Sequence, residues 1–207
     1  MKTQYLTICL SLVFFINYAQ ISFDEENGSI EFERIDQIDL SQDKIKKSTL
    51  NWFAKTFKDA NSVIKAETDD YIIGKGNFTI ESNINKYTFY PIIYFTLEVA
   101  FKEGRYRIKI DNFNQSLNGI ETNYVYFSEF SYEKYYDFTK SQIIQLSDGT
   151  PGKQMALKRL DNKKKSMKDY ELQKENMKRS FDQIKEQLEN ISISLNAHLK
   201  KTKKDDW

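Results

Sequence analysis

The segment that most constrains the fold is Phe95–Phe113, where apolar and polar residues alternate on both sides of a Glu103-Gly104 turn. Such alternation is typical of strands that bury one face. A two-residue turn places three apolar pairs on the same face of the hairpin: Phe101 with Tyr106, Val99 with Ile108 and Leu97 with Ile110. The other face carries charges, with Glu98 opposite Lys109. The segment therefore predicts an antiparallel sheet with one solvated face.

A strand, a helix and another hairpin precede this segment. Ser29–Ile38 mixes alternation with β-branched residues and predicts a first strand. In Ser41–Phe57, Ser41 can cap a helix whose apolar residues recur at helical spacing, and Ser62–Glu67 with Tyr71–Glu81 predicts a hairpin. The order strand, helix, four strands predicts an α+β fold in which the helix covers one face of the sheet.

Gly74 and Gly76 bracket Lys75 inside one of these predicted strands. A phosphate-binding glycine loop is one interpretation, but no third glycine follows at the required spacing and no helix begins after Gly76. A bulge or a close approach of another group to the backbone is the interpretation that we favour.

The segment from Asn112 to Pro151 has a weaker pattern. Glu121–Phe130 predicts one more strand, and an aromatic cluster follows, made of Tyr132, Tyr135, Tyr136 and Phe138. These rings either close the open side of the sheet, meet the C-terminal helix or form a platform for carbohydrate or peptide. Burial is the commoner use of large aromatic side chains.

A long C-terminal helix is predicted after the breaker Asp148–Gly152, because no glycine or proline occurs beyond it. Its apolar residues step by four and three, the heptad spacing: Met177, Phe181, Ile184, Leu188, Ile191 and Leu195. Three roles are open for this heptad stripe. It can pack on the sheet of its own chain, it can pair with a second copy in a homo-oligomer or with another partner, or it can lie on a membrane.

The N-terminus resembles an export signal, with Lys2 followed by an uncharged apolar run that ends at Ala19. The run is too short for a membrane span. We expect a signal peptide over residues 1–19, an α+β domain over 20–150 and a basic amphipathic helix or tail over 151–207, in a periplasmic or extracellular protein. Loss of Cys9 would leave no cysteine, which excludes disulfides and thiolate chemistry.

Charge is divided unevenly along the chain. Residues 20–151 hold 15 basic and 21 acidic residues, a net charge of −6, and residues 152–207 hold 15 basic and 9 acidic residues, a net charge of +6. The basic tail is either solvated and folded on its own body or attracted to an anionic partner such as phospholipid or lipopolysaccharide.

Four short segments of the chain resemble the domain-of-unknown-function family 4468: Leu40–Ile45, Trp52–Phe57, Ile73–Phe78 and Gly104–Arg107. The resemblance covers roughly Gly28–Asn114. It implies a curved antiparallel sheet with helices on one face, as in the TATA-box-binding protein, and it implies no activity. The C-terminal tail is longer and more heptad-like than the family leads us to expect.

The sequence argues against nucleic-acid binding and against catalysis. A DNA-binding saddle needs a basic surface, whereas residues 20–151 are net acidic. His198 is the single histidine and lies near the end of the tail, so we expect neither a Ser-His-Asp triad nor a multi-histidine metal site. The adjacent carboxylates Asp69 and Asp70 lie in a predicted turn, where acids are usually solvated.

We therefore predict a non-enzymatic binding module of the bacterial cell envelope, with no cofactor, no metal and no transmembrane span after signal cleavage. The sheet would be the scaffold, and its solvated face or the helical tail would make the contact. A structural protein that oligomerises through the heptad stripe and a hydrolase without a recognisable motif are the alternatives.

Cleavage after Ala19 would make Gln20 the first residue of the exported chain. Mass spectrometry of the protein recovered from a fractionated bacterial expression host should find this N-terminus outside the cytoplasm. An intact residue 1 in the exported fraction would contradict the prediction.

Overall fold

A computed structural model describes residues 19–24, 28–57, 63–84, 87–126 and 128–204. The predicted signal peptide, Cys9 included, lies almost entirely outside the described residues. The elements follow in this order: β1 (Ala19–Phe23), β2 (Ile30–Gln37), α1 (Gln42–Thr56), β3 (Ile64–Glu67), β4 (Tyr71–Thr79), β5 (Ser82–Ile84), β6 (Tyr87–Phe89), β7 (Ile92–Lys102), β8 (Arg105–Leu117), β9 (Ile120–Asn123), α3 (Tyr132–Gln145), α4 (Lys153–Asp161) and α5 (Lys163–Lys204).

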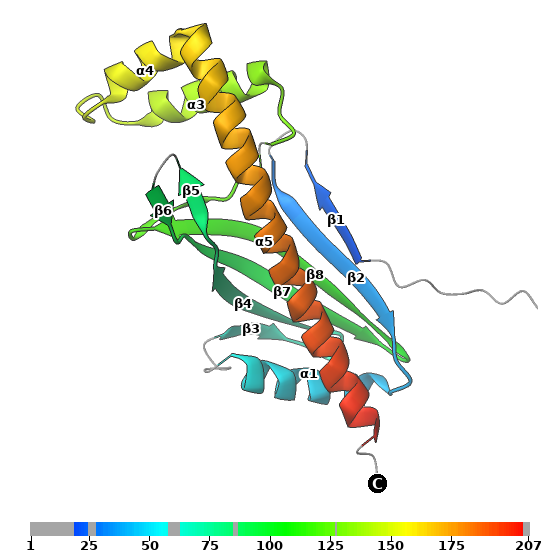
Figure 1. The fold of residues 1–207 in the computed structure, drawn as a ribbon. Coiled ribbons are helices and arrows are strands. Elements are labelled where there is room, and N and C mark those ends of the chain that lie inside the picture. Colours follow the sequence, from blue (N-terminus) through cyan, green and yellow to red (C-terminus); the bar gives the residue numbers. More distant parts are fainter. Residues whose placement is uncertain (1–18, 25–27, 58–62, 85–86, 127, 205–207) are drawn as a thin grey trace, which may run out of the picture.

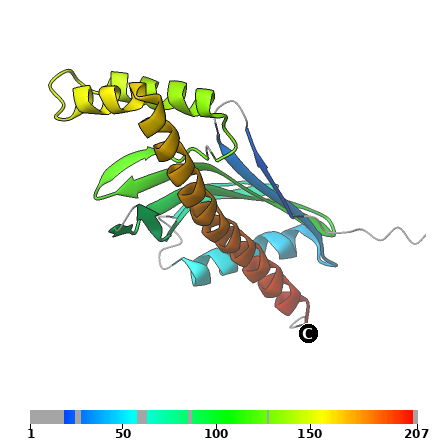
Figure 2. The same ribbon diagram turned by 45° about the horizontal axis from the view of Figure 1, so that its top comes forward.

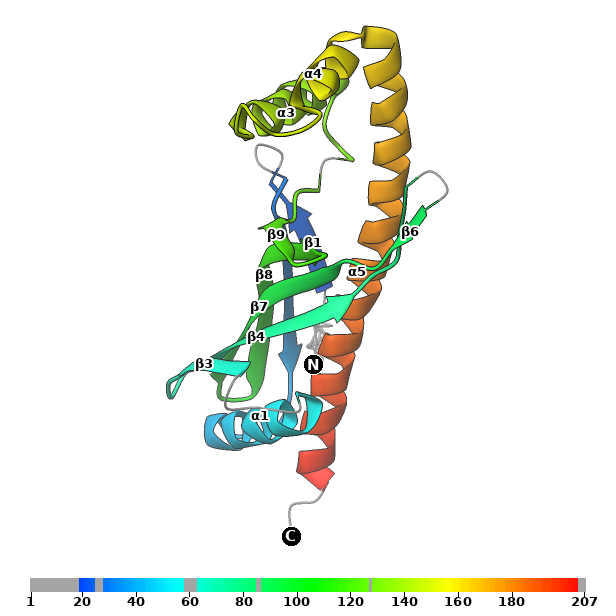
Figure 3. The ribbon, with the colours of Figure 1, turned by 90° about the vertical axis from the view of Figure 1, so that its left-hand side faces the viewer.

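The main sheet is antiparallel throughout and has the strand order β1-β2-β8-β7-β4-β3, with β9 added to the end of β8. Strands β5 and β6 form a separate small hairpin. Figure 1 and Figure 3 show α1 and α5 on the same side of the main sheet. The predicted α+β class, with a helix on one face of an antiparallel sheet and a long C-terminal helix, is confirmed.

The central hairpin has the register that its sequence predicts. Phe101 pairs with Tyr106, Val99 with Ile108 and Leu97 with Ile110, and all six side chains are buried. Alternation specified this register because a slip of one residue would have moved every apolar side chain to the solvated face. The hairpin is the centre of the core.

Helix α1 also begins as predicted, since the Ser41 side chain accepts a hydrogen bond from the Lys44 amide. Its Trp52 and Phe53 side chains are buried in the core beneath the sheet. Polar contacts then connect α1 to α5. Trp52 Nε1 donates to Ser194 Oγ at 3.0 Å, and the Ser48 and Thr202 hydroxyls lie 2.6 Å apart.

Helix α5 crosses the same face of the sheet diagonally (Figure 1, Figure 2). Ile184, Leu188 and Leu195 of the heptad stripe are buried, and its other three residues pack against the core. Of the alternatives for the stripe, the structure therefore takes packing on the chain's own sheet. The same residues therefore offer little apolar surface to another copy, since three are buried and Met177, Phe181 and Ile191 are partly buried.

Parts of the sequence prediction are wrong. The predicted strand Glu121–Phe130 is confined to β9 (Ile120–Asn123), because Tyr124 and Tyr126 leave the sheet to pack into the core. The aromatic cluster lies on α3, a helix that was not predicted. Of the alternatives for its rings, contact with the C-terminal helix is the one that the structure takes, because Tyr132 and Tyr135 pack against Tyr170 of α5. Strand β1 was also missed, because its residues border the expected signal peptide.

The tail is two helices, whereas one was predicted. The break falls at Asn162, whose side chain accepts a hydrogen bond from the Lys165 amide and so caps α5. The break was not predicted because neither glycine nor proline, the usual helix breakers, occurs at this point in the sequence. Helix α5 is amphipathic, and among the described residues no helix combines the length and the apolar character that a membrane span requires.

Gly74 and Gly76 permit close contact between β4 and aromatic rings. A β-carbon on Gly74 would lie 2.6 Å from Phe53 Cε1, and one on Gly76 would lie 2.4 Å from Phe95 Cζ. The interpretation as a close approach is confirmed, and the element that follows β4 is the strand β5, not a helix whose N-terminus could bind phosphate.

Replacing Gly76 by alanine should lower the free energy of unfolding by about 1–3 kcal/mol, because the Phe95 ring is buried between Phe78 and Phe113 and has no room to move. Urea unfolding of the purified chain measures the change. Lys75→Ala, on the exposed side of the same strand, is the matched control and should change stability by less than about 0.5 kcal/mol. Equal stability of Gly76→Ala and the wild type would contradict the packing.

Candidate functional site

The candidate site is the face of the main sheet that α1 and α5 leave uncovered. It is made by every second residue of β2, β8, β7 and β4, the residues whose neighbours in sequence point into the core. Figure 3 shows α5 on one side of these strands, and α1 packs with α5 in the same core. We call this surface the open face.

Ion pairs cross the open face between neighbouring strands. Arg107 Nη2 lies 2.6 Å from Glu98 Oε1 and Nη1 lies 3.9 Å from Glu33 Oε2. Lys109 Nζ lies 2.9 Å from Glu31 and 3.3 Å from Asp111, and the hydrogen bond to Glu31 raises the pKa of the Lys109 ammonium. Because these side chains are partly exposed, each pair contributes about 1 kcal/mol or less.

The predicted pairing of Glu98 with Lys109 needs a correction at the level of side chains. The two residues are cross-strand partners as expected, but Glu98 binds the diagonal Arg107 and Lys109 turns to the carboxylates of Glu31 and Asp111. The longer, forked guanidinium reaches both neighbouring strands at once. The spacing of residues in the sequence predicts the register of the strands, but it does not predict which diagonal neighbour each charged side chain pairs with.

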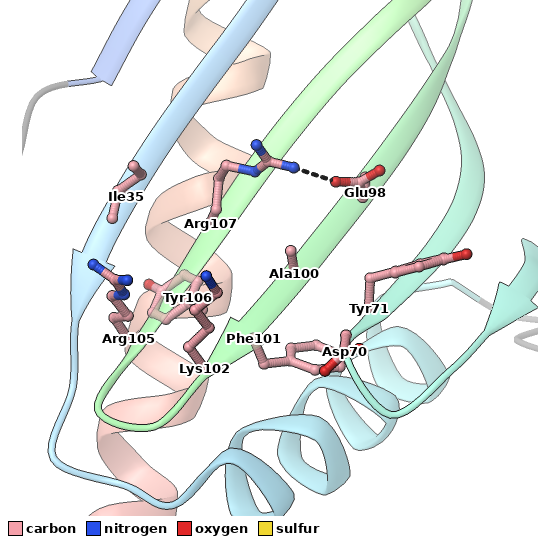
Figure 4. A pocket seen from close by; sticks show the side chains of 10 residues that line it. All are labelled: Ile35, Asp70, Tyr71, Glu98, Ala100, Phe101, Lys102, Arg105, Tyr106 and Arg107. Carbon is pink, nitrogen blue, oxygen red and sulfur yellow. Dashed lines mark hydrogen bonds and ion pairs between the residues drawn. The ribbon is translucent and has the colours of Figure 1, made fainter.

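A hollow of about 580 Å³ lies at the end of the open face nearest the β7–β8 turn. Figure 4 shows its lining. One row of cross-strand partners runs across it in the order Ile35, Arg107, Ala100, Tyr71. Ala100 has the smallest side chain of the row, so the hollow lies over Ala100 between the longer side chains of Arg107 and Tyr71.

The rim of the hollow toward the turn is cationic. Lys102 and Arg105 are exposed cross-strand partners, and within the described ranges neither forms an ion pair with an acidic side chain. Glu103, between them, instead accepts a hydrogen bond from the Gln42 amide at the start of α1, at 3.0 Å. Two uncompensated cations next to the exposed side chain of Ile35 suit a ligand that carries both an anionic and an apolar group.

A buried polar cluster lies on the other face of the same strands. Arg34 Nη2 donates to Asp36 at 2.9 Å, Tyr106 Oη donates to Asp36 at 3.1 Å, and Asn196 of α5 donates to Tyr106 Oη at 2.7 Å. Burial and the Asp36 charge raise the pKa of the Tyr106 hydroxyl far above its usual value, which keeps it a donor. Asp36 is 2% exposed and α5 covers it, so this cluster fixes the position of the helix and is closed to ligands.

The residues singled out from sequence as catalytic candidates do not meet. Asp69 Oδ1 accepts a hydrogen bond from Lys46 at 3.2 Å, and Asp70 accepts one from the Gln42 side chain at 3.1 Å. His198 lies on α5, where burial and the charges of Lys55 and Lys201 lower its pKa. Across the described residues no group of histidine, cysteine or carboxylate side chains could hold a metal ion.

Sequence reasoning identified the open face but missed the hollow. The alternation of β7 and β8 marks Ala100 and Arg107 as solvated residues. A small residue between two large ones is a signal for a hollow only when cross-strand neighbours are known. The position of Tyr71 opposite Ala100 depends on the pairing of β4 with β7, which no short turn specifies.

Residues 32–116 match a family model described as a domain of unknown function (DUF4468) with TBP-like fold. This range agrees with the segment over which the sequence resembles that family, so the resemblance is confirmed. No curated protein is significantly similar to the chain.

Two crystal structures are similar to the chain. One is a DUF4468 family protein from Bacteroides ovatus ATCC 8483, with 19% identity and a TM-score of 0.40 over 49% of this chain and 64% of that one. The other is a TBP-like protein from Parabacteroides distasonis ATCC 8503, with 14% identity and a TM-score of 0.46 over 86% of this chain and 96% of that one. The matched part thus spans less than two thirds of the Bacteroides ovatus protein.

Proposed function

We propose that the chain, whose residues 32–116 carry the DUF4468 domain, is an exported, non-enzymatic binding module of the bacterial cell envelope. Its contact surface is the open face, centred on the hollow over Ala100. The observation that supports this most is that α1 and α5 pack on one side of the sheet and leave this hollow accessible on the other. Export rests on the apolar N-terminal run that ends at Ala19.

The lining of the hollow favours a ligand with an anionic group beside an apolar one. Lys102 and Arg105 supply positive charge, and Ile35, which is 44% exposed, supplies apolar surface. Glu98 on the far side is compensated by Arg107, so it repels an anion less than a free carboxylate would. An extended peptide with an acidic residue fits this chemistry.

The open face does not suit a nucleic acid. A phosphate backbone binds best to a surface that is basic over many residues, whereas Glu31, Glu33, Glu98 and Asp111 alternate with the cations of this face. The likeness of fold to a DNA-binding protein therefore adds nothing to the assignment of function.

Replacing Ala100 by tryptophan fills the hollow and should abolish binding while the fold is kept, because the new side chain points away from the core. The wild-type chain and the variant would each be immobilised and exposed to fractionated envelope extract, and the retained components quantified by mass spectrometry. We expect components that the wild type retains at least tenfold more than Ala100→Trp.

Thr96→Trp is the matched control, since Thr96 lies on the same strand and the same face but outside the lining of the hollow. It should retain the same components as the wild type. An unchanged set of components on Ala100→Trp, with the same thermal stability, would refute the hollow as the binding site.

A further inference from the structure

Beyond the open face, a second surface lies at the far end of the molecule. Helices α3 and α4 and the first turns of α5, residues 131–170, extend past the end of the main sheet (Figure 1, Figure 3). We call this part the helical arm. Helix α4 is its outermost element, with α3 between it and the sheet.

The helical arm is held together by specific contacts. Arg159 forms two hydrogen bonds of 2.6 Å with Asp169, which connects α4 to α5. Tyr170 Oη donates to the Phe130 carbonyl at 2.7 Å, which connects α5 to the segment before α3. These contacts fix the conformation of the arm, so the side chains on its surface have defined positions.

Lys153 holds the tip of the arm, where α3 turns into α4. Its ammonium is buried and donates to the carbonyls of Ile144 and Leu146 and to Asp148, at 3.1, 2.5 and 3.0 Å. A lysine here satisfies carbonyls that the end of α3 leaves without partners. The backbone of the tip is thus fixed, while its apolar side chains point outward.

Three large apolar side chains of the tip are exposed. Ile144 is 56% exposed, Leu146 is 44% exposed and Met155 is 76% exposed. The inner side of α4 is the side that carries the buried Lys153 and Leu160. These side chains lie away from the core, so they do not stabilise the single chain by burial. Exposed apolar groups of this kind are typical of interaction sites.

Five lysines accompany them: Lys158, Lys163, Lys164, Lys165 and Lys168. All are exposed, and none of them forms an ion pair within the part of the chain that the structure describes. Three nearby acids have partners of their own, Asp148 in Lys153, Asp161 in the Tyr136 hydroxyl and Asp169 in Arg159. Glu133 and Asp137 of α3 line the same hollow as Lys163, which leaves the other four lysines as the cations of this surface. The segment 153–168 holds seven basic residues and one acidic residue.

We propose that the helical arm docks on the surface of an anionic phospholipid bilayer. Apolar side chains that enter the headgroup region, together with lysines that reach phosphates, are the two elements of peripheral membrane binding. Helix α4 is roughly 13 Å long at 1.5 Å per residue, so the apolar tip and the lysines at the α4–α5 corner can meet one membrane surface together. The arm would hold the sheet, with its separate open face, beside the membrane.

Co-sedimentation with vesicles tests this directly. The chain starting at Gln20 is used, because the apolar run before it would itself enter lipid, and it keeps every described element except the first residue of β1. We expect binding to vesicles of phosphatidylethanolamine and phosphatidylglycerol (3:1), weaker binding at high salt, and at least tenfold weaker binding to neutral phosphatidylcholine vesicles.

The combined change Lys163→Gln, Lys164→Gln and Lys165→Gln should weaken binding at least tenfold, since each lysine near an anionic surface is worth about fivefold. Its control removes the same charge from exposed positions farther along α5: Lys185→Gln, Lys200→Gln and Lys201→Gln. Ile144→Ser with Met155→Ser should weaken binding several-fold, whereas Ile120→Ser with Ile193→Ser, also exposed, should not.

Several results would overturn the proposal. These are equal binding to neutral and anionic vesicles, no binding to either, and an equal loss in the two lysine variants, which would indicate nonspecific charge attraction. A concentration-dependent dimer that Met155→Ser abolishes, without vesicle binding, would assign the arm to a second copy of the chain.

Discussion

The packing of α5 across the helical side of the sheet is the interaction on which the rest of the structure depends. Ile184, Leu188, Leu195 and Leu199 are fully buried there. Hydrogen bonds fix where the helix lies: Gln183 bonds the backbone of Glu81 in both directions, at 2.7 and 2.8 Å, and Asn196 bonds Tyr106. Because α5 and α1 together cover this side, the opposite face of the sheet stays open, and the start of α5 carries the helical arm beyond the sheet.

Much of the frame could be predicted from the sequence, because local rules specify it. The register of β7 and β8 follows from alternation and a two-residue turn, and Ser41 marks the start of α1. The features that could not be predicted from the sequence depend on contacts between residues that are far apart in the chain. Arg34 and Asp36 interrupt the apolar face of β2, a visible signal for a buried pair. The Tyr106 hydroxyl that donates to Asp36 and the Asn196 amide that donates to Tyr106 lie far from them in the sequence. The hollow depends on Tyr71 standing beside Ala100 in the sheet, and α3 depends on Tyr170 of α5, against which Tyr132 and Tyr135 pack.

The same fold thus separates two surfaces of different chemistry. The open face is a mosaic of paired charges with one hollow, bordered by Lys102 and Arg105, and such a surface can distinguish ligands by shape and charge together. The helical arm combines exposed apolar residues with uncompensated lysines, which favours a broad anionic surface. Neither surface includes the buried cluster around Asp36, whose part is to fix α5 on the sheet.

Helix α5 is part of the core and not an appendage of a self-sufficient domain. Thermal unfolding of a chain that ends at Pro151, compared with the full chain by circular dichroism, tests it most directly. Without α5, the apolar side of the sheet around Ile108 and Trp52 is exposed to water. We therefore predict that the shortened chain shows no cooperative unfolding transition. A cooperative transition near the midpoint of the full chain would contradict the account.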